Sequence, residues 1–430
     1  MHFNIGRLAM WCGGLTQTSF CLLELSVPLV ALMNGHSPLT MGLLLSVSMI
    51  SRLVATFPAG LYIEKLSPFS VLNWSNGIQA IVIVLLMWAG DAGNLNMTSL
   101  IVYSVSSGFI GAFTSTAGTR MLSSIRSRRS EGSGADRYEM IIQGANVAGR
   151  LVGVCLMVLD PAAGLAAGTI MSVAALLIGA EAAKYQSPVY SPARRSLPDA
   201  VDGLRHIGAD SFLTTALWVV LMTTMTAQAL TIDLLSTLAG DPMVTGLIVA
   251  MAPFGGLVGA RLARYRKRFG WRLERLTSRG RWPRQRQVQW ALASGFALVG
   301  PNRSILIVQA WVWVVVLLLP VENTWRLGFG LFTMGFIGTI ANVSIMTVIE
   351  HRVEEGKRGP VHAAIRLAAV AGLILGPTIG GFLAAQTGET GTSSSLAVAM
   401  LAATVTGTVA HLWRGRKRHV CVPTAGPSPF

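Results

Sequence analysis

Four ionisable side chains lie inside long apolar stretches of this sequence. Charged residues usually keep a protein soluble, but residues in such stretches do not face bulk water, so their presence indicates another role. They are Glu24, Arg52, Arg150 and Asp233, in the stretches 8–33, 40–63, 140–159 and 211–238 respectively. A charge at the centre of a bilayer costs roughly 2.5–3.5 kcal/mol on insertion scales, so such a residue faces a partner or a watery cavity. We therefore take these four residues as candidates for proton coupling or substrate contact.

Each candidate also has a purely structural interpretation. Glu24 can be a protonated carboxyl group hydrogen-bonded between helices, and Arg52 can form an ion pair that only holds helices together. Arg150 can complete a cluster of charges at the cytoplasmic side, and Asp233 can reach the outer interface. These alternatives stay open on the sequence alone.

Glu24 and Arg52 favour a particular coupling chemistry. A carboxyl group in a cavity can take up and release a proton, and a nearby guanidinium favours its charged form. The two residues lie near the middle of consecutive apolar stretches. If the protein alternates between two conformations that open to opposite sides of a membrane, we expect the two side chains to approach in one conformation and to separate in the other. Glu24 is the expected carrier of the coupling proton, with Asp233 next in line.

The sequence holds no pattern for soluble catalysis or nucleotide hydrolysis. It contains neither H-E-x-x-H nor G-x-x-x-x-G-K-[ST], and no two of its 4 cysteines have metal-ligand spacing. We expect no enzyme activity, no metal and no cofactor. Energy for any vectorial process must then come from an ion gradient or from the substrate itself.

The stretches that carry these residues are typical of membrane helices. Apolar residues make up 52% of the 430 residues and charged residues only 12%, against roughly 25% charged in a soluble domain. A spanning helix needs about 20 mostly apolar residues. Twelve such stretches can be counted, at residues 8–33, 40–63, 71–90, 98–122, 140–159, 162–183, 211–238, 244–262, 305–321, 327–349, 361–385 and 395–413.

The net charge of +15 is explained by topology and not by nucleic acid binding. The basic residues gather in alternate loops, and the opposite loops contain no Lys or Arg. The positive-inside rule then places both termini in the cytoplasm of a multi-pass protein of the inner (plasma) membrane. Residues 288–300 are also apolar, but counting them as a thirteenth span would move the basic residues 352–358 outside, so we reject it.

The polar stretch 185–210 divides the chain into two halves of six spans. We expect an N-terminal bundle at 1–184, a cytoplasmic linker at 185–210, a C-terminal bundle at 211–413 and a cytoplasmic tail at 414–430. Two halves of equal span number are typical of transporters built from repeats.

Two motifs have the small residues that close helix packing needs. After the second stretch, Gly60 is followed by Glu64 and Lys65. The stretch 361–385 contains G-x-x-x-G-P-x-x-G-G, formed by Gly372, Gly376, Pro377, Gly380 and Gly381. Its spacing places three of the glycines on one helix face, where two backbones can approach, and the proline can kink the helix.

These motifs resemble those of the major facilitator superfamily. Gly60, Glu64 and Lys65 are similar to its loop signature, although the usual Asp-Arg pair is replaced and later basic residues are missing. The second motif resembles the antiporter motif of the superfamily's exporters, placed here in the pseudo-symmetric partner of the fifth helix. Residues 143–146 (Gln-Gly-Ala-Asn) and Arg358-Gly359 resemble the drug, macrolide and siderophore exporter branch.

The resemblance implies an all-α membrane protein, with twelve transmembrane helices in two pseudo-symmetric six-helix bundles and a substrate cavity between them. It implies proton-coupled export of a small organic molecule, a drug-like compound or a siderophore, by alternating access. The resemblance also implies that the eight motif residues control the change of access state rather than bind substrate; they are Gly60, Glu64, Lys65, Gly372, Gly376, Pro377, Gly380 and Gly381. The alternatives are a metabolite importer of the same fold and a non-transporting membrane sensor or scaffold; we expect a monomer in the lipid bilayer.

Overall fold

The computed structural model describes residues 5–91, 96–128, 133–184, 207–208, 210–237, 242–278, 303–318, 324–353 and 355–419. Every element in these ranges is an α-helix. The first six are α1 (Ile5–Met33), α2 (Pro38–Lys65), α3 (Pro68–Asp91), α4 (Met97–Arg128), α5 (Ser133–Leu159) and α6 (Pro161–Ala183). The others are α8 (Ser211–Thr237), α9 (Pro242–Ser278), α11 (Arg303–Leu317), α12 (Thr324–Arg352) and α13 (Glu355–His419).

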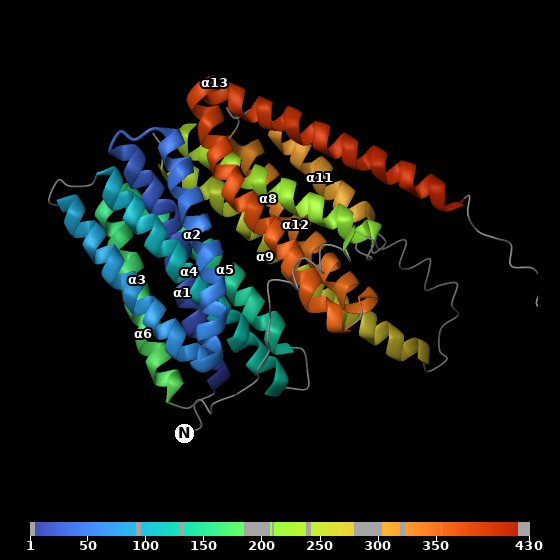
Figure 1. Cartoon of the computed structure of the whole chain (residues 1–430), viewed down its shortest axis with the longest axis horizontal. Helices are drawn as coiled ribbons and strands as arrows, with labels where there is room; N and C mark the ends of the chain where they lie inside the picture. Colours follow the sequence, from blue (N-terminus) through green and yellow to red (C-terminus); the bar gives the residue numbers. More distant parts are fainter. Residues whose placement is uncertain are drawn as a thin grey trace, which may run out of the picture.

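The helices in the described ranges account for the twelve spans that the sequence predicts, because α13 supplies two of them. Figure 1 shows α13 as two arms that meet at a bend. Eight segments of the described helices are long and apolar enough to cross a membrane, and α9 and α11 contain shorter apolar stretches at Gly246–Leu262 and Leu306–Leu317. In lipid, a helix is favoured because it satisfies its own backbone hydrogen bonds.

Two helix boundaries differ from the sequence prediction. The helix expected at 305–321 is α11, which ends at Leu317, while residues 288–300 lie outside the described residues. The helix expected to end at 262 is α9, which continues to Ser278. The basic stretch 264–286 is therefore helical, rather than a loop, as far as residue 278, because Arg and Lys are good helix formers once they are clear of the apolar layer.

The helices form two six-helix bundles with matching internal contacts. In the N-terminal bundle α1 packs on α5 and α2 packs on α4; in the C-terminal bundle α8 packs on α13 and α9 on α12. These are equivalent pairs, since α8 is the first helix of the second bundle and α13 contributes its fifth. Figure 1 shows the two groups side by side, blue to green and yellow-green to red.

The outward faces are apolar, as a lipid environment requires. On the peripheral helix α3, Trp74, Ile81 and Trp88 are 72%, 61% and 71% exposed. An apolar surface of this kind is an interaction site for lipid rather than for water. The polar residues are instead collected in the interior, between the helices that line the site described next.

Candidate functional site

The site begins with a close approach of α1 and α5. Added side-chain carbons at Gly149 and Gly153 of α5 would stand 2.5 Å from the Thr18 carbonyl oxygen and 3.2 Å from Leu22 Cγ of α1. No side chain fits at Gly149 against the Thr18 carbonyl, and a side chain at Gly153 would require Leu22 to shift, so the two glycines allow the backbones to approach closely. The residue next to Gly149 is Arg150, so the same contact fixes the point from which its long side chain starts.

A polar seam runs along this α1–α5 contact. Gln17 Nε2 donates a 2.8 Å hydrogen bond to Asn146 Oδ1, and Cys21 Sγ donates one of 3.0 Å to the same oxygen. Further along the same two helices, Arg150 Nη2 of α5 lies 3.4 Å from Glu24 Oε2 of α1. The Glu24 and Arg150 side chains are only 31% and 23% exposed, so this is a partly buried ion pair within the membrane region.

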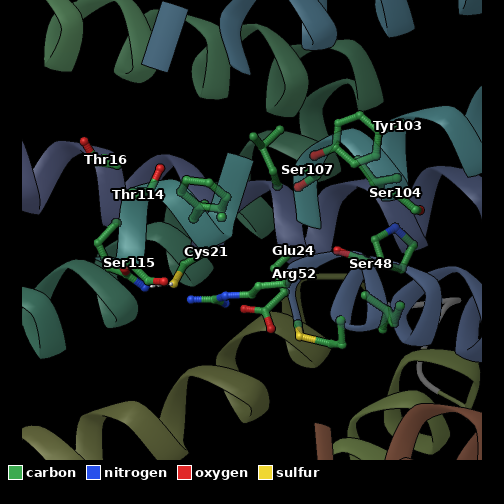
Figure 2. A pocket seen from close by; sticks show the side chains of 18 of the residues that line it. Thr16, Cys21, Glu24, Ser48, Arg52, Tyr103, Ser104, Ser107, Thr114 and Ser115 are labelled. Carbon is green, nitrogen blue, oxygen red and sulfur yellow. Dashed lines mark hydrogen bonds between the residues drawn. The ribbon is translucent and has the colours of Figure 1, made fainter. Parts of the chain in front are cut away.

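Glu24 faces a cavity of about 400 Å³, a size within the range of small-molecule sites. Figure 2 shows the Glu24 and Arg52 side chains pointing into this space, with hydroxyl groups around them. The polar residues that line it are Thr16, Gln17, Glu24, Ser48, Arg52, Tyr103, Ser104, Ser107, Thr114, Ser115 and Arg366. An apolar wall is added by Phe20, Met41, Leu44 and Leu45, among others.

The structure gives different positions to the four ionisable candidates. Glu24 and Arg52 line the cavity, and Arg150 reaches it through its bond to Glu24. Arg52 is close enough to Glu24 and Arg366 to interact with both electrostatically. Asp233 is 1% exposed within α8 and is not among the described residues that line the cavity.

Arg366 is the functional candidate that the sequence reasoning missed. It lies in the first arm of α13, inside the apolar stretch 361–385, and lines the cavity. The signal was the same one that identified Arg52, a lone charge within an apolar stretch. Arg366 follows shortly after the Arg358-Gly359 motif near the start of α13, and the sequence interpretation of this region rests on that motif.

One end of the cavity is closed by contacts between the two bundles. At the end where α1 gives way to α2, here named the α1–α2 end, Ser46 Oγ donates a 2.7 Å hydrogen bond to the Ile374 carbonyl oxygen of α13. It also lies 2.7 Å from the Thr378 hydroxyl. Gly42 packs directly against the Pro377 carbonyl, leaving no room for a side chain there.

The glycines of the α13 motif serve two contacts. An added carbon at Gly372 or Gly380 would lie 2.8 Å from the Leu221 carbonyl oxygen or 2.5 Å from the Ala229 carbonyl oxygen of α8, and Gly376 packs on the Met225 carbonyl between them. On the other side, Gly381 would meet the Pro38 carbonyl oxygen of α2 at 2.7 Å. The predicted close approach along one face is thus present, inside the C-terminal bundle.

Some sequence candidates cannot be placed in this way. Gly60, Glu64 and Lys65 belong to the last turns of α2, but their side chains lie outside the described residues. Within the described part of the chain, no group of three His, Cys, Asp or Glu side chains is arranged to hold a metal ion.

Comparison with known proteins agrees with this architecture. The Major Facilitator Superfamily matches residues 9–301, and no curated protein matches the chain. The solved nucleoside transporter NupG is 14% identical, with 95% of this chain and 99% of that chain covered and a TM-score of 0.65.

Two further solved structures share the fold. A bacterial homologue of the iron transporter ferroportin, inward-facing, is 14% identical over 95% of this chain and 98% of its own, with a TM-score of 0.66. A bacterial homologue of the human lysosomal transporter Spinster, inward-facing and unoccupied, is 13% identical over 94% of both chains, with a TM-score of 0.63. At these identities the similarity to solved structures shows only that the fold is shared. The family match covers most of the chain, so this chain belongs to the major facilitator superfamily of membrane transporters.

Proposed function

We propose that this chain is a secondary transporter of the inner membrane that moves a small organic molecule by alternating access, with Glu24 as the site of proton coupling. The observation that carries the proposal is the Glu24–Arg150 ion pair at the wall of a polar cavity. Ionisable groups inside transporter bundles commonly mark ion and substrate pathways. No other acidic residue lines the cavity among those that the structure describes.

The two bundles supply the moving parts in this proposal. We assign residues 1–184 and 211–413 to the two bundles, 185–210 to a linker and 414–430 to a tail, with both termini cytoplasmic and the protein monomeric. The α1–α2 end is then the outer end, and the Ser46 contacts to α13 close it. Two of the similar solved structures are described as inward-facing, which supports assigning this arrangement to the same state.

The coupling step follows from the ion pair. A proton that binds to Glu24 removes the charge that attracts the Arg150 guanidinium, and the two side chains then separate. Because Gly149 and Gly153 hold the backbones of α1 and α5 together, the released guanidinium turns toward the cavity. Proton binding thereby changes the charge that the substrate meets, which couples the two fluxes.

Two features favour opposite directions of transport. The glycine motif of α13 resembles that of exporters and supports proton-coupled antiport, the efflux of a drug-like compound or a siderophore. The excess of arginine around Glu24 supports import as the second candidate, since a proton on Glu24 would strengthen the binding of an anion. One experiment can distinguish export from import.

The test compares solutes inside and outside cells that carry the wild-type chain, the Glu24→Gln variant or no chain, at matched protein levels. The proposal expects at least one solute whose distribution depends on the wild-type chain and is collapsed by a protonophore. Accumulation outside identifies export, and accumulation inside identifies import. If no solute changes, the chain is a sensor or scaffold and the proposal is wrong.

A further inference from the structure

The Glu24–Arg150 ion pair is held by the placement of two helices rather than by neighbouring side chains. Among the described residues, the Arg150 side chain makes one hydrogen bond, to Glu24, and its Nε atom is buried without a hydrogen-bond partner. Arg150 Nη2 and Glu24 Oε2 lie 3.4 Å apart, whereas a charge-assisted hydrogen bond usually measures about 2.7–2.9 Å. A pair of this length, with no other side chain to brace it, depends on how α1 and α5 are placed against each other.

The side-chain amide of Asn146 links α5 to α1 beside this pair. Its Oδ1 atom accepts a hydrogen bond of 2.8 Å from Gln17 Nε2 and one of 3.0 Å from Cys21 Sγ, both on α1. Its Nδ2 atom donates a 3.3 Å hydrogen bond to Gln143 Oε1 on α5. An amide oxygen has two lone pairs, so both acceptor positions of Asn146 serve the α1–α5 contact.

Helical spacing makes the amide contact and the ion pair neighbours. Cys21 lies three residues before Glu24 on α1, and Asn146 lies four residues before Arg150 on α5. Residues three or four apart lie on the same helix face, so the two contacts join the same pair of faces. Gly149 keeps the backbones close between them, since an added carbon there would stand 2.9 Å from Cys21 Cβ. Because the ion pair is already long, a small sliding of α1 along α5 would separate it.

Asn146 also connects this contact with the C-terminal bundle. Gln143, which accepts from its amide, has its Oε1 atom 3.9 Å from the position of an added carbon at Gly256 of α9. Helices α5 and α9 pack against each other across the interface between the bundles. A movement of α9 against α5 therefore acts on a residue that is bonded to Asn146.

We propose that Asn146 is a positioning residue of the proton-coupling site, whose amide fixes the register of α1 against α5 in which Arg150 contacts Glu24. The inference rests on the proposed function and names a residue that controls the coupling site. When the bundles move, the α5–α9 contact displaces Asn146 and the ion pair lengthens. The carboxylate then loses the charge that favours it, and Glu24 binds a proton more readily. Proton binding thereby depends on the access state.

The experiment follows the protonation of Glu24 by infrared spectroscopy of the purified full-length protein in lipid. The C=O stretching band of protonated carboxyl groups is recorded as the pH is changed, and the component that Glu24→Gln removes belongs to Glu24. Asn146→Leu removes both hydrogen-bonding functions from a side chain of similar size. It should raise the pH midpoint of this component by about 0.5–1 pH unit, a part of the roughly 1–3 units that a nearby opposite charge supplies. Asn146→Gln keeps an amide and should restore part of the wild-type midpoint.

The other ionisable groups that face the same cavity as Glu24 are unchanged in this variant. They are Cys21 on α1, Arg52 on α2, Tyr103 on α4 and Arg366 on α13. Helix α6 also packs on α1, but it contributes none of the described residues that line the cavity. A changed midpoint in Asn146→Leu therefore reports the contact between Glu24 and Arg150.

Asn76→Leu is the matched control. Asn76 of α3 is 1% exposed and donates a 3.0 Å hydrogen bond to Thr16 Oγ1 of α1, one residue before Gln17. Its replacement removes a buried amide bond to the same helix from a different neighbour. The melting temperature should fall at least as far as in Asn146→Leu, and the midpoint of the Glu24 component should stay at the wild-type value.

Two further variants keep the inference testable if Asn146→Leu does not fold. Gln17→Leu and Gln143→Leu each remove one of the bonds to the Asn146 amide, so each should raise the midpoint in the same direction by a smaller amount. Unchanged midpoints in the variants of Asn146 and Gln17, or an equal rise in Asn76→Leu, would overturn the inference while the coupling proposal stands.

The outcome is thus separable from that of the proposed function. If Glu24→Gln removes no pH-dependent band, Glu24 does not titrate, and the coupling proposal fails together with the inference. If the midpoint rises as expected in Asn146→Leu but solute flux does not respond to a proton gradient, the coupling proposal fails while the positioning role of Asn146 stands.

Discussion

At the scale of single residues, the sequence predicts which ionisable groups lie inside the helices but not which of them are in contact. Glu24, Arg52 and Arg150 stood out because a charge inside an apolar stretch is costly. From the sequence we expect Arg52 to approach Glu24 in one access state and to separate from it in the other; in this structure Arg150 is the arginine in direct contact with Glu24. That pairing depends on the α1–α5 approach at Gly149 and Gly153, a tertiary contact that spacing along one helix cannot reveal.

The Glu24–Arg150 pair predicts non-additive effects on stability. Glu24→Gln and Arg150→Gln should each lower the apparent melting temperature, because each leaves one charge partly buried without its opposite. The double variant should lose less than the sum of the two single losses, with a coupling of roughly 0.5–3 kcal/mol for groups in contact. Thermal unfolding of the four proteins in one detergent measures this.

A control cycle uses the surface pair Lys184 and Glu181, whose charged atoms lie 2.8 Å apart in an exposed position. Exposed pairs contribute little, so Glu181→Gln and Lys184→Gln should add without coupling. Strictly additive losses at Glu24 and Arg150 would mean that the ion pair contributes nothing to the folded protein.

At the scale of helices, the contacts of the glycines show which backbones come close together. The motif of α13 was expected to bring two backbones together, and Gly372, Gly376 and Gly380 do so against α8. The sequence could not show that Gly381 serves a different contact, to α2 across the bundle interface. The period of a helix gives the face of a residue, but the identity of the neighbouring helix is set by the whole fold.

Replacing Gly376 with Leu should disturb the α8–α13 contact. The new side chain would meet the Met225 carbonyl, and overpacking typically costs about 1–3 kcal/mol. We expect transport to fall at unchanged protein level, because one access state is favoured over the other. Gly90→Leu on α3 is the control, since an added carbon at Gly90 has nothing within 4 Å; equal transport by both variants would remove the motif from the mechanism.

Replacing Gly42 with Leu should open the α1–α2 end. No side chain fits between Gly42 and the Pro377 carbonyl in the closed arrangement, so α2 and α13 must move apart there. A cysteine introduced at the cavity residue Leu45 should then react faster with an impermeant thiol reagent added from outside. An unchanged labelling rate in the Gly42→Leu background would show that this contact does not close the cavity.

At the scale of the whole molecule, the order of apolar and polar stretches along the chain predicts the twelve helices and their division into two bundles. Apolar length decides the first, and the polar stretch 185–210 indicates the second. The helix boundaries near 262 and 305–321 were less accurate, because α9 continues beyond the apolar layer. The sequence predicts a cavity between the bundles but not its lining, which includes Arg52 and Arg366 from opposite bundles.

The orientation in the membrane gives a further prediction. Reporter fusions at Arg129, Arg195, Arg279 and Arg416 should all report the cytoplasm, and a fusion at Gly93 should report the outside, because the basic loops stay inside. The fusion at Arg195 is the decisive one. A periplasmic signal there would contradict the arrangement of six spans followed by six.

The central claim is that Glu24 couples transport to protons, and flux in vesicles tests it most directly. Purified wild-type protein and the Glu24→Gln variant are reconstituted at equal density, and uptake of the solute found in cells is measured with and without a proton gradient. Gln mimics protonated Glu24, so the variant should lose gradient-driven flux but keep exchange of solute across the membrane. Glu24→Asp should keep part of the gradient response, and Glu181→Gln should behave like the wild type. If wild type and Glu24→Gln respond equally to the gradient, Glu24 is a structural residue and the coupling claim is wrong.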